Sequence, residues 1–156
     1  MNEAIPIQKE AALKAHKNAN SKGKTLLENL LGKKLFLKEV TSRIKTVADV
    51  LEDNNITQEQ IDKMFANTPE HFKCQFIAEL LCKSLNEGWT PDWDNPNEHK
   101  YYLWFKMGSS GFRFSGYDNW IPGSNVGSSL SFKSQKLAEY AGKQFEDLYK
   151  KIMINQ

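Results

Sequence analysis

Residues that bind metals or act as nucleophiles are scarce in this sequence, which has only two cysteines and three histidines among 156 residues. The three histidines, His16, His71 and His99, are far apart in the chain, and the cysteines lack the paired spacing of zinc ligands. The stretch DWDNPNEH places Pro96 where a calcium loop needs an oxygen ligand. We therefore expect no metal and no cofactor.

The short motifs of common enzyme classes are also missing: there is no nucleophile elbow, Walker loop, dinucleotide fingerprint or HExxH. The Gly- and Ser-rich stretch PGSNVGSSLSF opens an apparent strand, whereas a phosphate cradle opens a helix. Asp92, Asp94 and Glu98 are the acids that an acid–base site would use, but turns beside proline favour the same residue types. The sequence therefore favours a protein that is not an enzyme, and these three acids leave an enzyme with an acid–base site as the alternative.

Long apolar runs are absent, since no stretch approaches the roughly 18 to 20 residues that a membrane helix needs. The first residues, MNEAIPIQKEAALK, lack the apolar region of a secretory signal. Cys74 and Cys82 are eight positions apart in one expected helix, which separates their Cα atoms by about 12 Å, too far for a disulfide. We expect a cytoplasmic protein with no membrane partner.

The sequence has enough apolar residues, 40%, to build a core, and its charges are unevenly distributed. Residues 1–38 contain eight lysines and three glutamates, residues 39–100 contain six basic and twelve acidic side chains, and residues 101–156 contain seven basic and four acidic ones. We expect a basic helical N-terminal segment over residues 1–40 and an α+β domain over residues 41–156. The basic ends can attract polyanions or serve as solvated helix faces.

Helices are expected in the first part of the chain. Pro6 suits a first helical turn and Gly32 suits a helix end, with a break between residues 18 and 23. Residues 33–41 alternate leucine with lysine for a few positions, which predicts a short strand.

Three further helices have recognisable N-terminal caps. Thr46 with Asp49, and Thr57 with Gln60, match the capping-box pattern. Thr68 followed by a proline predicts the start of a long core helix that ends before Gly88, with phenylalanine, isoleucine and leucine at helical spacing.

After residue 98 the pattern becomes that of strands. Residues 99–107 and 111–117 are rich in aromatic residues and flank the turn GSSG, which predicts a β-hairpin. Residues 126–132 are expected to form a third strand, and Ser134 then caps a C-terminal helix with an apolar stripe. The predicted fold is α+β: N-terminal helices, a core helix, a small antiparallel sheet and a C-terminal helix packed on that sheet.

Aromatic residues gather in the hairpin region, where residues 89–120 contain ten of the chain's 18 aromatic side chains. Alternate residues of a strand share a face, so Tyr102, Trp104 and Lys106 point one way while the residues between them point the other. A sheet covered by helices on one side needs one apolar face. The second face calls for cover by loops, a partner, or a ligand that stacks on rings.

The stretch SSGFRFSGY partly resembles the RNP1 motif of the RRM fold, whose rings stack on RNA bases. Gly111, Phe112, Phe114 and Tyr117 match that motif. Three other positions depart from it: Ser110, Arg113 and Ser115. The expected order of elements also differs from that of an RRM, so only the chemistry of ring stacking carries over.

The segments LNEGWTPDWDNPNEHKYYLWF and VGSSLSFKSQKLAEYAGKQFEDLYK resemble a family of small uncharacterised proteins of Bacteroidales genomes, prophages and mobile elements. The likeness covers residues 44–151 and rests on the W-x-P-x-W turn, the Tyr-Tyr-x-Trp-Phe strand and the L-A-x-Y-A-G-K-Q-F helix. It implies no activity and no functional residues. What it implies is a setting, that of an intracellular accessory protein of a phage or mobile element.

These features lead to a hypothesis of a non-enzymatic binding module that contacts nucleic acid, with single strands favoured, through the aromatic and basic sheet surface. The alternative is a protein-interaction or virion-associated module that uses the same patch. The oligomeric state is open. The candidate binding residues are Tyr102, Trp104, Lys106, Phe112, Arg113, Phe114, Tyr117 and Trp120.

Overall fold

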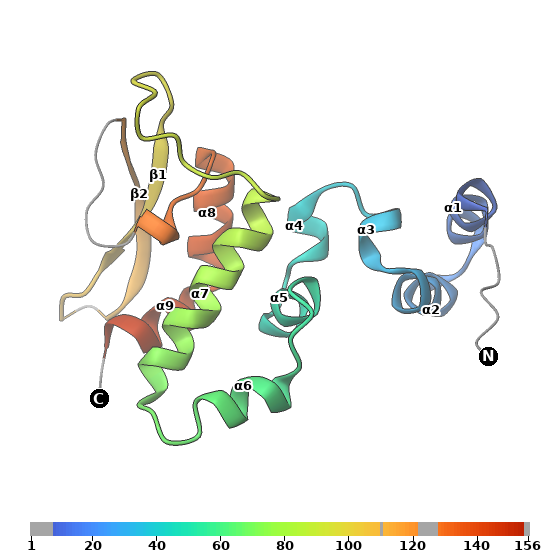
Figure 1. Cartoon of the computed structure of the whole chain (residues 1–156), viewed down its shortest axis with the longest axis horizontal. Coiled ribbons are helices and arrows are strands. Elements are labelled where there is room, and N and C mark those ends of the chain that lie inside the picture. The colour runs from blue at the N-terminus through green and yellow to red at the C-terminus, as the bar shows by residue number, and fades with distance from the viewer. Residues whose placement is uncertain (1–7, 110, 122–127, 155–156) are drawn as a thin grey trace. The chain divides into compact units, whose positions relative to one another are not determined.

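The computed structural model describes residues 8–109, 111–121 and 128–154 (Figure 1). The fold is α+β, with helices before and after a two-stranded antiparallel sheet in the chain, in agreement with the class expected from the sequence. The contacts within the chain divide it into two compact units, residues 1–43 and residues 44–156.

The first unit is helical. It contains α1 (Lys9–Asn18), α2 (Ser21–Leu31), α3 (Lys33–Phe36) and α4 (Val40–Arg43). Asn20 caps α2 by accepting the backbone N–H of Gly23 at 2.9 Å, which confirms the predicted break. The His16 imidazole joins three of these helices, because it lies 2.7 Å from Glu28 Oε1 and stacks on Phe36 with 4.3 Å between ring centroids.

The strand predicted for residues 33–41 is wrong. Gly32 ends α2 with a φ of 83°, a left-handed conformation that favours glycine, and the chain then enters α3 and α4. The alternation of leucine and lysine here spans too few residues to outweigh the helix propensity of these residue types.

The second unit begins with two short helices, α5 (Val47–Asp53) and α6 (Gln58–Met64). Both predicted capping boxes are present. Thr46 accepts the backbone N–H of Asp49 while the Asp49 carboxylate accepts that of Thr46, and Thr57 and Gln60 make the same reciprocal pair. These local patterns therefore set where each helix begins.

The core helix is α7 (Glu70–Asn86), which starts slightly later than predicted. Pro69 is its N-cap, and the Thr68 hydroxyl donates instead to the carbonyl of Phe65 at 3.0 Å. The helix ends where Glu87 and Gly88 adopt φ values of 51° and 86°, in line with the expected glycine stop. Within the second unit α7 packs against α5 and α9, so it forms the centre of the core (Figure 1).

The C-terminal part of the chain forms two helices where the sequence predicts one. Ser134 caps α8 (Gln135–Gln144) as expected, but the chain leaves helical geometry at Phe145 before α9 (Glu146–Met153) begins. The break brings the Glu146 carboxylate to the backbone N–H of Phe114, 2.7 Å away. A continuous apolar stripe in the sequence does not reveal this change of direction.

The sheet consists of β1 (Lys100–Lys106) and β2 (Arg113–Trp120), which pair antiparallel and confirm the predicted hairpin. The prediction of a third strand is not met by the described residues. Phe132 makes one isolated bridge to Tyr101, while Ser128–Leu130 form a 3-10 helix, η1. Positions 126 and 127 lie outside the described residues.

Candidate nucleic-acid interface

The register of the hairpin assigns each residue to a face of the sheet. Tyr102 lies opposite Asp118 and Leu103 lies opposite Tyr117. The register then shifts between Trp104 and Phe105, which leaves Ser115 as the extra residue of a β-bulge. Directly opposed residues share a face, so these pairs separate an inner face from an outer face.

The inner face is covered by the C-terminal helices. Phe105 stacks on Tyr149 of α9 with 5.2 Å between ring centroids, and it also stacks on Phe112 at 4.8 Å. Phe114 packs so closely on α8 that a Cβ added to Gly142 would lie 2.1 Å from its ring. The rings on this face belong to the packing of the hairpin on α8 and α9.

Three of the candidate binding residues are thus part of this inner packing. Phe112 and Phe114 both contact Phe105, and Tyr117 contacts Tyr101 edge to face at 5.6 Å. Each is half-buried. The match to RNP1 therefore coincides with the interior of this fold, and these rings do not join the other candidates on the opposite face.

The outer face carries the other five candidates. Trp104 is 62% exposed and Trp120 is 55% exposed, while Tyr102 between them is half-buried. Lys106 and Arg113 are a directly opposed, exposed pair at the turn end of the hairpin. We call these five residues, together with Asp118, the outer sheet face.

The residue opposite Trp104 is a glycine, which helps to explain the exposure of this indole. Gly116 has no side chain to pack on the ring, and nothing lies within 4 Å of the position that a Cβ would take there. No side chain at the directly opposite position of β2 therefore covers the Trp104 ring.

Asp118 is a member of the outer sheet face that the sequence did not single out. It is exposed, and its Oδ1 accepts the backbone N–H of Asn119 at 2.8 Å. Strand alternation predicts its face only when the hairpin register and the bulge are known. Net charge on this surface is consequently lower than the two cations alone suggest.

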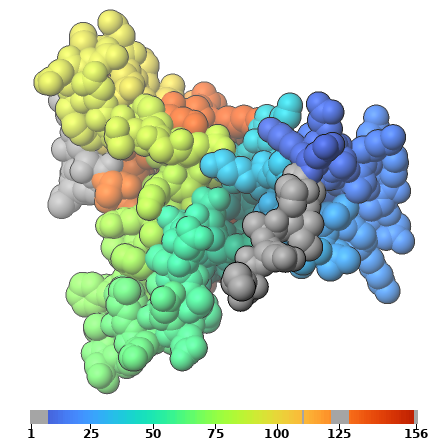
Figure 2. Space-filling model, turned by 45° about the vertical axis from the view of Figure 1, so that its right-hand side comes forward, coloured from blue at the N-terminus to red at the C-terminus, as the bar shows by residue number. Residues whose placement is uncertain are grey.

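The loop before β1, residues 88–99, protrudes from the second unit (Figures 1 and 2). Glu98 organises it by accepting the Trp89 indole N–H at 3.1 Å and the backbone N–H of Asp92 at 2.8 Å. These bonds, with Lys100 nearby, lower the pKa of Glu98. A carboxyl held ionised in this way is poorly suited to act as a general acid.

Lys100 secures the same loop from inside. Its side chain is 0% exposed, and its amine donates to the carbonyls of Asp92, Glu98 and Ile121. The amine also lies 5.3 Å from the centroid of the Trp93 ring. The two tryptophans of the W-x-P-x-W turn therefore serve the structure of this loop.

The other acids of the possible acid–base site have turn roles or are exposed. Asp92 Oδ1 accepts the backbone N–H of Asp94 at 3.0 Å, the geometry of an Asx turn. Within residues 8–109, 111–121 and 128–154, no group of three His, Cys, Asp or Glu side chains lies close enough to hold a metal ion. The hydrogen bonds of the loop therefore give Asp92 and Glu98 structural roles, while Asp94 is exposed.

Both cysteines are free and buried. Burial raises the pKa of the Cys74 thiol and also raises that of Cys82. Because the thiolate is the reactive form, a raised pKa makes both thiols weak nucleophiles at neutral pH.

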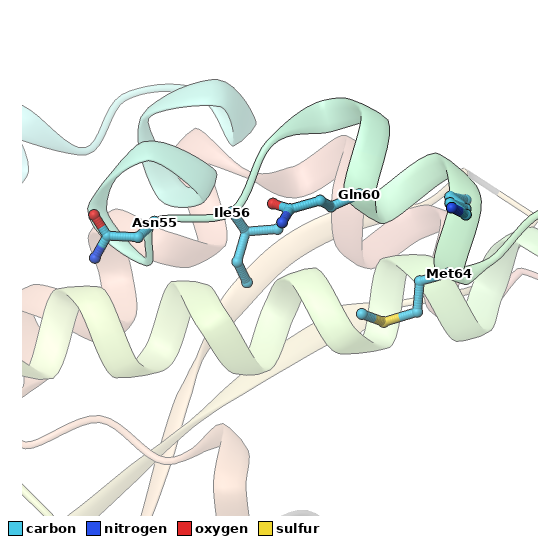
Figure 3. Close-up of a pocket in the computed structure, with 5 residues that line it drawn as sticks. Asn55, Ile56, Gln60 and Met64 are labelled. Atoms are coloured by element: carbon cyan, nitrogen blue, oxygen red, sulfur yellow. The ribbon is translucent and has the colours of Figure 1, made fainter.

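Two hollows in the second unit lie away from the outer sheet face. One of about 370 Å³ lies along α6 and the turn before it, and it is lined by Asn55, Ile56, Gln60, Lys63 and Met64 (Figure 3). Another of about 470 Å³ lies between α7, residues 88–91 and η1, with a mostly apolar lining. Neither contains any of the eight residues predicted to bind.

Comparison with known proteins gives no relative. No family model, no curated protein and no solved structure matches the chain. Among the described residues, no helix is both long enough and apolar enough to cross a membrane.

Proposed function

We propose that this protein binds single-stranded nucleic acid through the outer sheet face. The observation that carries the proposal is a pair of tryptophans, Trp104 and Trp120, on one face of one sheet, each with more than half of its surface exposed. Exposed apolar side chains that gather on one face form a patch, and such patches mark interaction sites on protein surfaces. A nucleotide base offers a flat surface that stacks on such a ring.

The spacing of the rings suits more than one base. Trp104 lies opposite position 116 and Trp120 occurs four residues further along β2, about 13 Å at the usual rise of a strand. Tyr102 lies between them on the same face. Each stacked base contributes about 1–3 kcal/mol and does so for any base, so two or three stacked bases give useful affinity.

Cations flank these rings on one side. Lys106 and Arg113 lie at the turn end of the hairpin, where they can neutralise phosphates of a strand that follows the rings. The eight lysines of residues 1–38 add a second source of attraction for a polyanion. The resemblance of residues 44–151 to the Bacteroidales family supports a phage or mobile element as the setting, with an intracellular accessory role.

The test is fluorescence anisotropy with a labelled dT12 strand at low salt. We expect the wild-type chain to bind, and we expect Trp104→Ala with Trp120→Ala to weaken binding at least tenfold. Phe72→Ala is the matched control, because Phe72 is a ring on α7 that is 54% exposed. Equal losses in both variants, or no binding of dT12 at tens of micromolar protein, would overturn the proposal.

Salt dependence provides an independent measurement. If Lys106 and Arg113 each neutralise one phosphate, they contribute a slope of about −1.4 to log K against log salt. Lys106→Ala with Arg113→Ala should remove that part of the slope while the rings still bind. An unchanged slope would show that these two cations take no part.

A second candidate, binding of a protein partner at the same surface, is favoured by Asp118. An acid between the rings opposes phosphates, and a surface of Trp, Tyr and Arg is typical of protein hot spots. Nuclease treatment of material captured from lysate separates the two candidates. A protein that stays bound after nuclease, and is lost with Trp104→Ala, would favour the second.

A further inference from the structure

Asp118 occupies the centre of the outer sheet face, a position that nucleic-acid binding alone does not explain. It lies directly opposite Tyr102, and its neighbours on the same face of β2 are Gly116 and Trp120. Directly opposed residues in an antiparallel pair have Cβ atoms about 5 Å apart. A base that stacks on Tyr102 therefore has one edge within reach of this carboxylate.

A carboxylate in that position selects among bases because it only accepts hydrogen bonds. Its Oδ1 already accepts the N–H of Asn119, which restricts how the group can turn. A second lone pair of Oδ1 and both lone pairs of Oδ2 remain for a ligand, so the carboxylate pairs best with a base edge that presents two adjacent donors. Acceptors at the same edge would face a negative oxygen and be rejected.

Guanine is the base that presents such an edge, since its N1–H and its N2 amine lie side by side. Cytosine and adenine each place an amine beside an acceptor nitrogen, and thymine and uracil have one N–H between two carbonyls. All of these edges are open in a single strand, where Watson–Crick groups are unpaired. The carboxylate can make two parallel bonds with guanine and one with each of the others.

We propose that Asp118 makes the outer sheet face selective for guanine in single strands, an inference that rests on the proposed function. Tyr102 or an adjacent tryptophan provides the stacking surface, and Asp118 recognises the edge of the stacked base. The same carboxylate weakens binding of strands without guanine, because it repels phosphate and finds no matched pair of donors. Selectivity is gained at the expense of general affinity.

The experiment measures anisotropy of three labelled hexamers, TTGTTT, TTITTT and TTTTTT, with the full chain at fixed low salt. Hypoxanthine, the base in the second strand, lacks the N2 amine but keeps N1–H. We expect guanine to bind about tenfold more tightly than thymine, with hypoxanthine between them, as a bidentate pair predicts. A single guanine per strand avoids four-stranded structures.

Variants of Asp118 separate recognition from folding. Asp118→Ala should remove the preference for guanine and at the same time raise the affinity for TTTTTT, because repulsion is lost. Asp118→Asn should also lose the preference, since its amide offers one donor and one acceptor. Glu59→Ala on α6 makes the same change of charge at an exposed residue and should leave the ratio of affinities unchanged.

The possible results are distinct. Equal affinity of the wild-type chain for all three hexamers, with binding still dependent on Trp104 and Trp120, overturns guanine selectivity and leaves the proposed function in place. Failure of all three strands to bind overturns the proposed function itself. A guanine preference that persists in Asp118→Ala assigns recognition to another residue and also overturns this inference.

Discussion

The two units of the chain differ in how much they bury. In the first unit the buried residues among those described are Ala12, Val40 and Arg43, and α2 buries none of its residues. The second unit contains helix α7, which alone buries eight. Hydrophobic burial is the main stabilising contribution to a fold, so most of the stability of the described structure must reside in the second unit.

One cluster of polar and ring contacts, centred on His16, joins helices of the first unit. His16 pairs with Glu28 and stacks on Phe36, whereas two leucines of α2, Leu26 and Leu30, remain exposed. Segments of about 40 residues rarely bury enough surface to fold alone. The outer sheet face therefore belongs to the better-packed of the two units.

The largest effect on the free energy of unfolding is expected when the same substitution, leucine to alanine, is made in each of the two units. Leu81→Ala removes a side chain that is 0% exposed in α7, and it should lower the free energy of unfolding by about 2–5 kcal/mol. Leu30→Ala removes a leucine side chain that is 69% exposed in α2. This substitution should change the free energy of unfolding by no more than about 0.5 kcal/mol. Urea unfolding followed by circular dichroism measures both.

Tryptophan fluorescence reports the unfolding of the second unit alone, because all four tryptophans lie in that unit. Leu81→Ala should shift the fluorescence midpoint to lower urea. A shift of similar size for Leu30→Ala would mean that stability is shared evenly, and the contrast between the units would be wrong.

The second effect concerns the buried amine of Lys100. Lys100→Met keeps most of the volume but leaves three backbone carbonyls without their donor, and it should cost about 1–3 kcal/mol. Lys106→Met is the matched control on the same strand, because that side chain is exposed. Thermal unfolding of the two variants measures the difference, and equal midpoints would contradict a structural role for Lys100.

Short-range patterns predicted much of the fold. The caps at Thr46, Thr57 and Ser134 were predictable because a cap involves residues three positions apart. The prediction of a third strand failed in the described residues, because pairing with β1 depends on a partner about 30 residues away. Among residues 128–132, Phe132 is the one that bridges to β1. Lys100 was missed because a lysine gives no sign in the sequence that its amine will be enclosed.

The candidate site was predictable in part, because strand alternation is also a short-range pattern. Strand alternation separated Tyr102, Trp104 and Lys106 from their neighbours, and the structure places all three on one face. Which face α8 and α9 would cover was not predictable, because that depends on Gly142 admitting the Phe114 ring. Phe112, Phe114 and Tyr117 were therefore grouped with residues on the opposite side.

The third effect on stability concerns the close approach of the Phe114 ring to Gly142 of α8. Gly142→Ala improves helix propensity by about 1 kcal/mol, but its new methyl would lie 2.1 Å from the Phe114 ring and must displace it. Overpacking of this kind costs about 1–3 kcal/mol, so we expect a net loss of stability in urea unfolding.

Gly23→Ala in α2 is the counterpart in the first unit. Its nearest neighbour would be the Ala19 Cβ at 3.0 Å, so the gain in propensity and the crowding should nearly cancel. A Gly142→Ala variant as stable as wild type would mean that the hairpin can move on α8 without cost.

The smallest effect concerns acid pH. The described carboxyls with a lowered pKa, Asp62, Glu70, Glu98 and Glu139, all belong to the second unit, and Glu98 owes its shift first to the N–H of Asp92. A pKa lower in the folded state means that the unfolded chain binds the proton first as pH falls. The contribution of Glu98 is therefore complete above its ordinary pKa of 4.5 and is lost as pH falls through the folded value. Glu98→Gln should flatten the decline of unfolding midpoints between pH 6 and pH 3, because it removes the carboxyl whose pKa is lowered in the folded state. Identical pH profiles for wild type and Glu98→Gln would show that the bonds of this carboxylate contribute nothing to the stability of the second unit.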